Sequence, residues 1–159
     1  WVFAACTLGM AAVRLHYTLH LPPHDPLNGG VNFYDGIIAE ILATAGLTLL
    51  FTPVLIVRIS RRHDHGFLST FGGELIILLL LFILWIVGAA ITTQRWGDLG
   101  WCHIYSACRL LTAIVAFTWT SWIMTLFLTI SCIWYIVRND GFTQPVHGRY
   151  YPERNIRQV

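Results

Sequence analysis

Apolar residues gather in four long runs along this chain, and three polar connectors separate the runs. The runs cover about residues 1–20, 34–57, 71–93 and 108–137. A membrane core about 30 Å thick needs roughly 20 apolar residues in a helix, so each run is long enough to span it. We therefore expect an all-α integral membrane protein, an antiparallel up-down bundle of four transmembrane helices at residues 1–138 with a tail at 139–159.

Composition supports a membrane class. Of the 159 residues, 56% are hydrophobic and 11% are charged, against about 25% charged in a soluble domain. The first run has neither a basic start nor a clean cleavage site, which favours a membrane span over a signal peptide. Because the chain begins with Trp1 rather than methionine, we expect further residues upstream.

The basic residues are all arginine, and most of them gather in two places. Three lie in or beside the connector between the second and third runs, and four lie in or beside the tail. Because short cytoplasmic loops carry an excess of basic residues, we expect both termini and this connector to be cytoplasmic. Arginine also binds phosphate through paired hydrogen bonds. We therefore expect contacts with lipid headgroups at Arg58, Arg61, Arg62 and Arg138, whereas a net charge of +2 does not indicate nucleic acid.

The third connector, "QRWGDLGWCHIYSAC", then lies on the extracytoplasmic side, where disulfides persist. We expect a disulfide between Cys102 and Cys108, which requires a non-helical chain up to about Cys108, since bonded Cα atoms lie within about 7 Å. The alternative is two free thiols near a helix start. Trp96 and Trp101 suit the headgroup layer as outer interfacial aromatics.

A few charged residues lie well inside the apolar runs, where charges are costly. Arg14 and Glu40 fall at about the same depth on neighbouring antiparallel spans, which predicts a buried ion pair that holds the first helix against the second. The alternative is a proton or ion path. Glu74 opens the third run near its cytoplasmic end, within reach of the arginines there.

Histidines raise two further hypotheses. His16, His20 and His24 are spaced by four, but two prolines should end the helix before the third, so wet interfacial histidines are favoured over a zinc site. The stretch "HLPPHD", from His20 to Asp25, matches the H-x-x-x-x-D pattern of glycerolipid acyltransferases without any second polar cluster. We expect no catalytic residues, no cofactor and no bound metal.

Small residues favour close contact between helices in lipid. The second, third and fourth runs carry such residues at helical spacing. We expect helix packing through Ala39, Ala43, Gly46, Gly88, Ala113, Ala116 and Thr120.

The chain resembles MARVEL-type four-span membrane proteins of the fungal kind. The resemblance rests on the four spans, the late-span arginine in "AAVRLHYT", and a cysteine-bearing connector that leads into "CRLLTAIVAFTWTSWIMTLFL". The motif "WGDLGWC" is also similar to one in claudin-like proteins, where it follows the first span rather than the third. The MARVEL resemblance implies a non-enzymatic organiser that gathers lipids and proteins at the plasma membrane or in vesicles.

Three functions remain from different classes. The first is a membrane organiser that packs with lipid and with itself or partner membrane proteins as a homo-oligomer or scaffold. The alternative is a small transporter or channel subunit that uses Arg14, Glu40 and Glu74. A lipid-modifying enzyme that uses His20 and Asp25 would need a cleft beside the membrane surface.

Overall fold

The computed structural model describes residues 1–25, 27–60, 71–97 and 104–139. These residues form no strand, one short 3₁₀ helix, η1 (Leu27–Gly30), and four α-helices: α1 (Val2–Leu19), α2 (Gly36–Ser60), α3 (Phe71–Trp96) and α4 (Ser106–Asn139). All four α-helices are long and apolar enough to cross a membrane. The expected all-α fold with four apolar helices is confirmed, and residues 140–159 of the expected tail lie outside the described residues.

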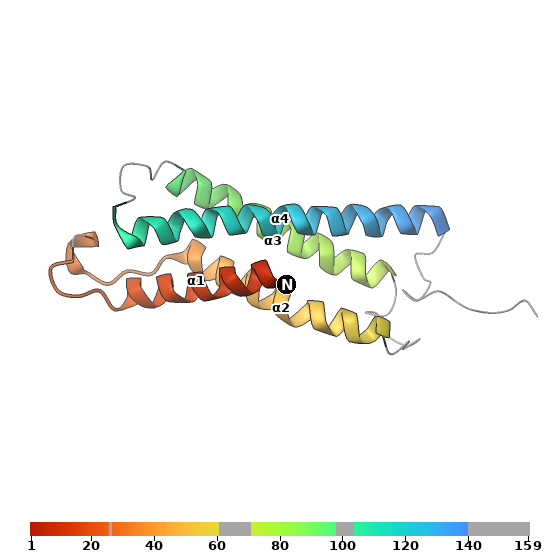
Figure 1. Cartoon of the computed structure of the whole chain (residues 1–159), viewed down its shortest axis with the longest axis horizontal. Helices are drawn as coiled ribbons and strands as arrows, with labels where there is room; N and C mark the ends of the chain where they lie inside the picture. Colours follow the sequence, from red (N-terminus) through yellow and green to blue (C-terminus); the bar gives the residue numbers. More distant parts are fainter. Residues whose placement is uncertain (26, 61–70, 98–103, 140–159) are drawn as a thin grey trace, which may run out of the picture.

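The four helices lie side by side in one bundle (Figure 1). α1 packs against α2 and α4, and α3 packs against the same two helices, most extensively against α4. At one end of the bundle α1 and α3 finish and α2 and α4 begin (Figure 1). We call it the connector end, because residues 20–35 join α1 to α2 there, and we call the opposite end, where α4 finishes, the tail end.

The interior combines large apolar side chains with threonines. Trp85 is 1% exposed and forms the largest fully buried side chain, with isoleucines of α2 and α4 around it. The buried threonine hydroxyls are satisfied locally: Thr7 donates to Phe3 O at 2.8 Å, and Thr118 donates to Ile114 O at 2.6 Å. Threonine can therefore fill the interior without leaving a buried donor unpaired.

The outer surface of the bundle is as apolar as its interior. Leu50 on α2 is 67% exposed, Ile83 on α3 is 58% exposed, and Phe127 on α4 is 61% exposed. A helix that is hydrophobic on all sides is typical of a membrane span, because a water-facing helix carries polar side chains on its outer face.

The helix faces differ in part from those expected. Gly88 is buried at the contact between α3 and α2, and Gly46 lies near Leu8 of α1. Ala43 and Ala116 are exposed, so they do not lie in the contacts within the bundle, and any contact that they make with a neighbouring molecule stays a prediction. Larger residues take the contacts in their place, because α2 and α4 turn other faces inward. Those buried faces consist of Ile37, Ile38, Ile41 and Ala45 on α2, and Leu111, Ile114, Thr118 and Ser121 on α4. The remaining predicted residues are half-buried: Ala39, Ala113 and Thr120.

Candidate functional site

Residues 20–35 fold back over the connector end of the bundle. The N–H of Phe33 donates to Thr18 O at 3.0 Å, and the N–H of Leu21 donates to the side-chain oxygen of Asn32 at 2.8 Å. Within this fold Gly30 has φ +77°, and a Cβ there would lie 2.8 Å from the backbone nitrogen of His24. Only glycine fits such a backbone without strain, so the turn depends on it.

A hydrogen bond ties this connector to α1. The hydroxyl of Tyr17 donates to Asp25 Oδ2 at 2.5 Å, and the N–H of Leu27 donates to Asp25 Oδ1 at 2.8 Å. The Tyr17 hydroxyl, and then the Leu27 N–H, hold the pKa of Asp25 below its usual range. The carboxylate is therefore the form that organises the turn.

Asp35 is the most buried acid at the connector end, at 5% exposed. It stands directly before α2, where its carbonyl accepts the N–H of Ala39 at 3.2 Å. Arg95, from the last turn of α3, lies 3.7 Å away. Burial raises the pKa of Asp35, although Arg95, Arg14 and the Ile37 N–H act to lower it. Asp35 therefore precedes α2 at the N-cap position and also forms an ion pair with α3 through Arg95.

The predicted ion pair between Arg14 and Glu40 does not form. In the described part of the chain, the one ion pair within 4.0 Å is Arg95–Asp35. Arg14 is 4% exposed, its Nε has no hydrogen-bond partner, and its strongest electrostatic attraction is to Asp35. The reason is orientation: Arg14 lines a groove against α4, whereas Glu40 lies against α3.

Glu40 occupies the contact between α2 and α3. Its Oε1 accepts the hydroxyl of Thr44 at 2.9 Å, and its Oε2 is buried without a hydrogen-bond partner. A Cβ on Gly88 would lie 2.9 Å from Oε2, so the glycine makes room for the carboxyl group. No arginine in the described residues lies close enough to Glu40 to pair with it.

A groove opens between α1 and α4 at the connector end, which we call the Arg14 groove. It has a volume of about 340 Å³. Its lining comes from one side of α1 and from the first turns of α4, namely Val13, Arg14, Tyr17, Ser106, Ala107 and Leu110. Arg14 is the one charged residue in this lining.

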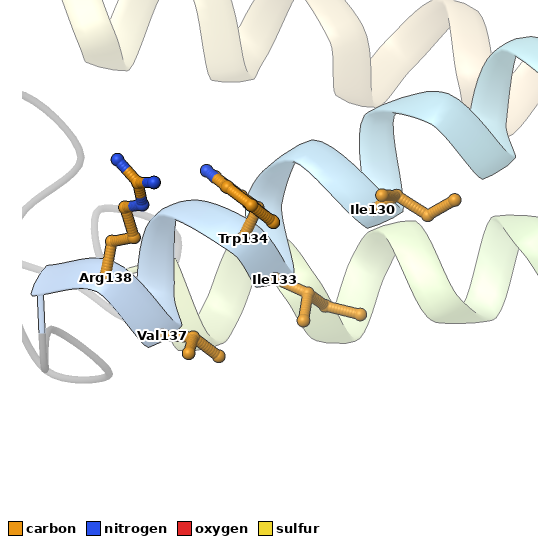
Figure 2. Close-up of a pocket in the computed structure, with 5 residues that line it drawn as sticks. All are labelled: Ile130, Ile133, Trp134, Val137 and Arg138. Carbon is orange, nitrogen blue, oxygen red and sulfur yellow. The ribbon is translucent and has the colours of Figure 1, made fainter.

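A second groove, of about 370 Å³, lies at the tail end of α4. Arg138 and Trp134 extend from the same side of the helix, and the guanidinium carbon lies 5.0 Å from the ring centroid (Figure 2). Ile130, Ile133 and Val137 complete an apolar lining. The predicted headgroup contact Arg138 is therefore a cation held on an aromatic ring beside apolar side chains.

Several predicted residues lie outside the described residues: Arg61, Arg62, Trp101, Cys102 and the side chain of Arg58. The expected disulfide therefore stays a prediction. Its partner Cys108 lies in the first turn of α4, which begins at Ser106. Trp96 packs half-buried against the main apolar core.

His16, at the end of α1, and the following His20 and His24 form no metal-binding group with the other described residues. The rings of His16 and His20 stack with centroids 4.6 Å apart, and His24 lies in the connector with φ 69°. Within the described residues, no three His, Cys, Asp or Glu side chains are grouped closely enough to hold a metal ion.

No family model, curated protein or solved structure matches the chain. The resemblance to MARVEL-type proteins therefore stays a prediction.

Sequence reasoning missed the part that Asp35 plays. A signal was present, because an aspartate stands immediately before the apolar run "GIIAEIL", and this position favours a helix N-cap. Its contact with Arg95 depends on how α3 packs beside α2, which no local pattern indicates.

Proposed function

We propose that the chain is a four-span membrane protein whose helices cross the bilayer in antiparallel order, with both termini and the tail end cytoplasmic. The observation that carries the proposal is the apolar exterior of all four long helices. The orientation is supported by the arginines of the second connector and of the tail, since cytoplasmic loops are rich in basic residues.

Within the membrane, we propose a non-enzymatic role as an organiser that packs with lipid and with itself or with partner membrane proteins. Short connectors leave little extramembrane structure for a catalytic domain, and the exposed apolar faces offer broad surfaces for lateral contact. The MARVEL-type resemblance points to the plasma membrane or to secretory vesicles.

Extraction in native-like lipid particles tests this proposal. We expect the chain to resist alkaline extraction and to leave the membrane with further copies or with a constant set of membrane proteins, measured by mass photometry and cross-linking. A chain released by alkali sinks the membrane assignment. A monomer surrounded by bulk lipid alone contradicts the organiser role.

A second candidate, a small transporter or channel subunit, is favoured by the unpaired Oε2 of Glu40. The distance between Glu40 and Glu74 argues against a shared path. Glu40 contacts Gly88 on α3, and Gly88 lies 14 residues, or roughly 21 Å of helix, beyond Glu74. Proton or ion flux through liposomes decides between the two. Flux that Glu40→Gln abolishes without loss of stability supports transport, and the absence of flux supports the organiser.

A further inference from the structure

We propose that the Arg14 groove binds the phosphate group of a membrane phospholipid. The proposal rests on the membrane assignment above and names one lipid class that the protein recognises. It is carried by two separate features that meet in the groove: a buried arginine whose Nε has no hydrogen-bond partner, and the start of a long helix.

The arginine comes first. Arg14 is 4% exposed, yet its Nε is buried without a hydrogen-bond partner, and no carboxylate in the described residues lies within 4.0 Å of the guanidinium. Its guanidinium carbon lies 5.9 Å from the ring centroid of Tyr17, which offers no hydrogen-bond acceptor in its face comparable to a phosphate oxygen. A guanidinium presents five N–H donors in a planar fork that matches the oxygens of phosphate. Burial without partners is costly for such a group, so an anion in the groove would complete its hydrogen bonding.

The second feature is the N-terminus of α4. Ser106 and Ala107 line the groove and are the first residues of this 34-residue helix. In the described residues, the first turn bonds Cys108 N and Arg109 N to Tyr105 O, which leaves the N–H groups of Ser106 and Ala107 without partners inside the helix. The N–H groups of a helix's first turn and the helix dipole make such an end attractive to an anion.

Nearby acids reduce the positive charge of the groove without cancelling it. Asp25 and Asp35 attract Arg14 electrostatically, but Asp25 accepts hydrogen bonds from Tyr17 and Leu27, and Asp35 lies 3.7 Å from Arg95. Neither carboxylate lines the groove. An entering phosphate would therefore meet donors rather than acids.

The remaining walls favour a lipid over a free ion. Val13 and Leu110 are apolar, Val13 is 60% exposed on α1, and the groove is open rather than enclosed between the two helices. A phosphate near Arg14 would place the attached acyl chains along these side chains. Inorganic phosphate would gain nothing from them.

The test uses the full chain in mixed micelles, with native mass spectrometry of bound lipid. Phosphatidylglycerol is compared with diacylglycerol of the same acyl chains, which lacks the phosphate. We expect retention of phosphatidylglycerol alone, and Arg14→Gln should weaken this retention roughly tenfold, because charge-assisted hydrogen bonds are the strong ones.

Arg14→Gln can also perturb folding, so a second variant fills the groove and leaves the arginine in place. Ala107→Trp should displace the lipid, while Ala116→Trp, on an exposed position of the same helix, should retain it. Equal retention of diacylglycerol, or retention unchanged by Ala107→Trp, overturns the inference. Full competition by inorganic phosphate overturns the lipid assignment. Flotation of each variant with liposomes is measured separately, so a failed membrane assignment is distinguishable from a failed lipid site.

Discussion

Gly88 sets how closely α2 and α3 approach at the level of Glu40. A Cβ at this position would lie 2.9 Å from Glu40 Oε2 and 3.1 Å from Ile41 Cγ1, whereas a Cβ at Gly46 would meet Leu8 at an ordinary 3.9 Å. Alanine in place of glycine stabilises a helix interior by about 1 kcal/mol. We expect Gly46→Ala to stabilise the chain by about this amount. Gly88→Ala should not stabilise it, because the added Cβ meets Glu40 and Ile41 at short distances. Unfolding in dodecyl sulfate titrations measures both variants.

A chain that carries Glu40→Ala provides the control for that experiment. With Glu40→Ala, the shorter contact at Gly88 disappears, and Gly88→Ala should become better tolerated. If Gly88→Ala already matches Gly46→Ala in the native background, the close approach of α2 and α3 is not present in solution.

Asp35 and Asp25 should change the stability of the folded chain in opposite directions as pH rises. Burial raises the pKa of Asp35 above its usual 3.8, so the folded chain holds the proton more tightly than the unfolded chain. Its contribution therefore makes stability fall as pH rises from about 3.8 through the raised pKa. Asp35→Asn should remove this fall in melting temperature measured against pH.

Asp25 supplies the comparison. The Tyr17 hydroxyl lowers the pKa of Asp25 below 3.8, so its stabilisation is present above pH 3.8 and is lost as pH falls through the lowered pKa. Asp25→Asn should therefore remove a loss of stability on the acid side. Identical pH profiles for the two variants contradict the assignment of these environments.

At the scale of the helices, indole groups link neighbouring elements through threonine. Trp85 Nε1 on α3 donates to Thr48 Oγ1 on α2 at 3.2 Å, and Trp119 Nε1 on α4 donates to Thr93 Oγ1 on α3 at 2.8 Å. Because Trp85 is 1% exposed, its N–H has no access to bulk solvent. The α2–α3 contact therefore depends on Thr48.

Thr48→Val should cost about 1 kcal/mol of unfolding free energy, within the range measured for hydrogen bonds between membrane helices. Thr52→Val is the matched control, since the Thr52 hydroxyl donates only to the carbonyl of Thr48 in its own helix. The measurement is chemical unfolding in micelles. If the two substitutions have equal effects, the hydrogen bond between Trp85 and Thr48 does not stabilise the contact between α2 and α3.

The helices follow from the sequence more completely than their contacts do. Long apolar runs predict four spans, because only length and apolar content decide whether a helix suits a membrane. Apolar runs carry little information on which face turns inward, since lipid-facing and interior positions are both hydrophobic. Residue size alone therefore predicts a contact for Ala116, which is exposed, and depth alone predicts a pair between Arg14 and Glu40, which face different neighbours.

The beginning of α4 carries the remaining prediction at this scale. Cys108 lies in the first turn of the helix, so a bond to Cys102 would fix the chain that enters it. A short closed loop stabilises by about 2 kcal/mol in the entropy model. We expect mass spectrometry of protein never exposed to reductant to find the linked peptide. Alkylation of both thiols under these conditions contradicts the disulfide.

In the whole molecule, apolar side chains cover the sides of the bundle, and charged side chains lie mainly at its ends. The apolar exterior suits the bundle to a membrane. At the connector end, Asp25 and Asp35 accompany Arg14 and Arg95, and at the tail end Arg138 stands without an acid in contact among the described residues. The proposed orientation rests on the arginines of the second connector and of the tail, because cytoplasmic segments are distinguished by their basic residues.

Orientation can be measured at both ends in the same cells. We expect an epitope tag fused after Val159 to be protected from external protease in intact cells, and to be cleaved once the membrane is opened. In the connector, Val31 is 64% exposed, so Val31→Cys should react with a membrane-impermeant maleimide from outside, above the background of the native cysteines. A cleaved tag with an unlabelled Val31→Cys would reverse the orientation. If both positions are protected, or both are accessible, they lie on the same side of the membrane. This result would contradict the proposed topology, because three spans separate residue 31 from the tail.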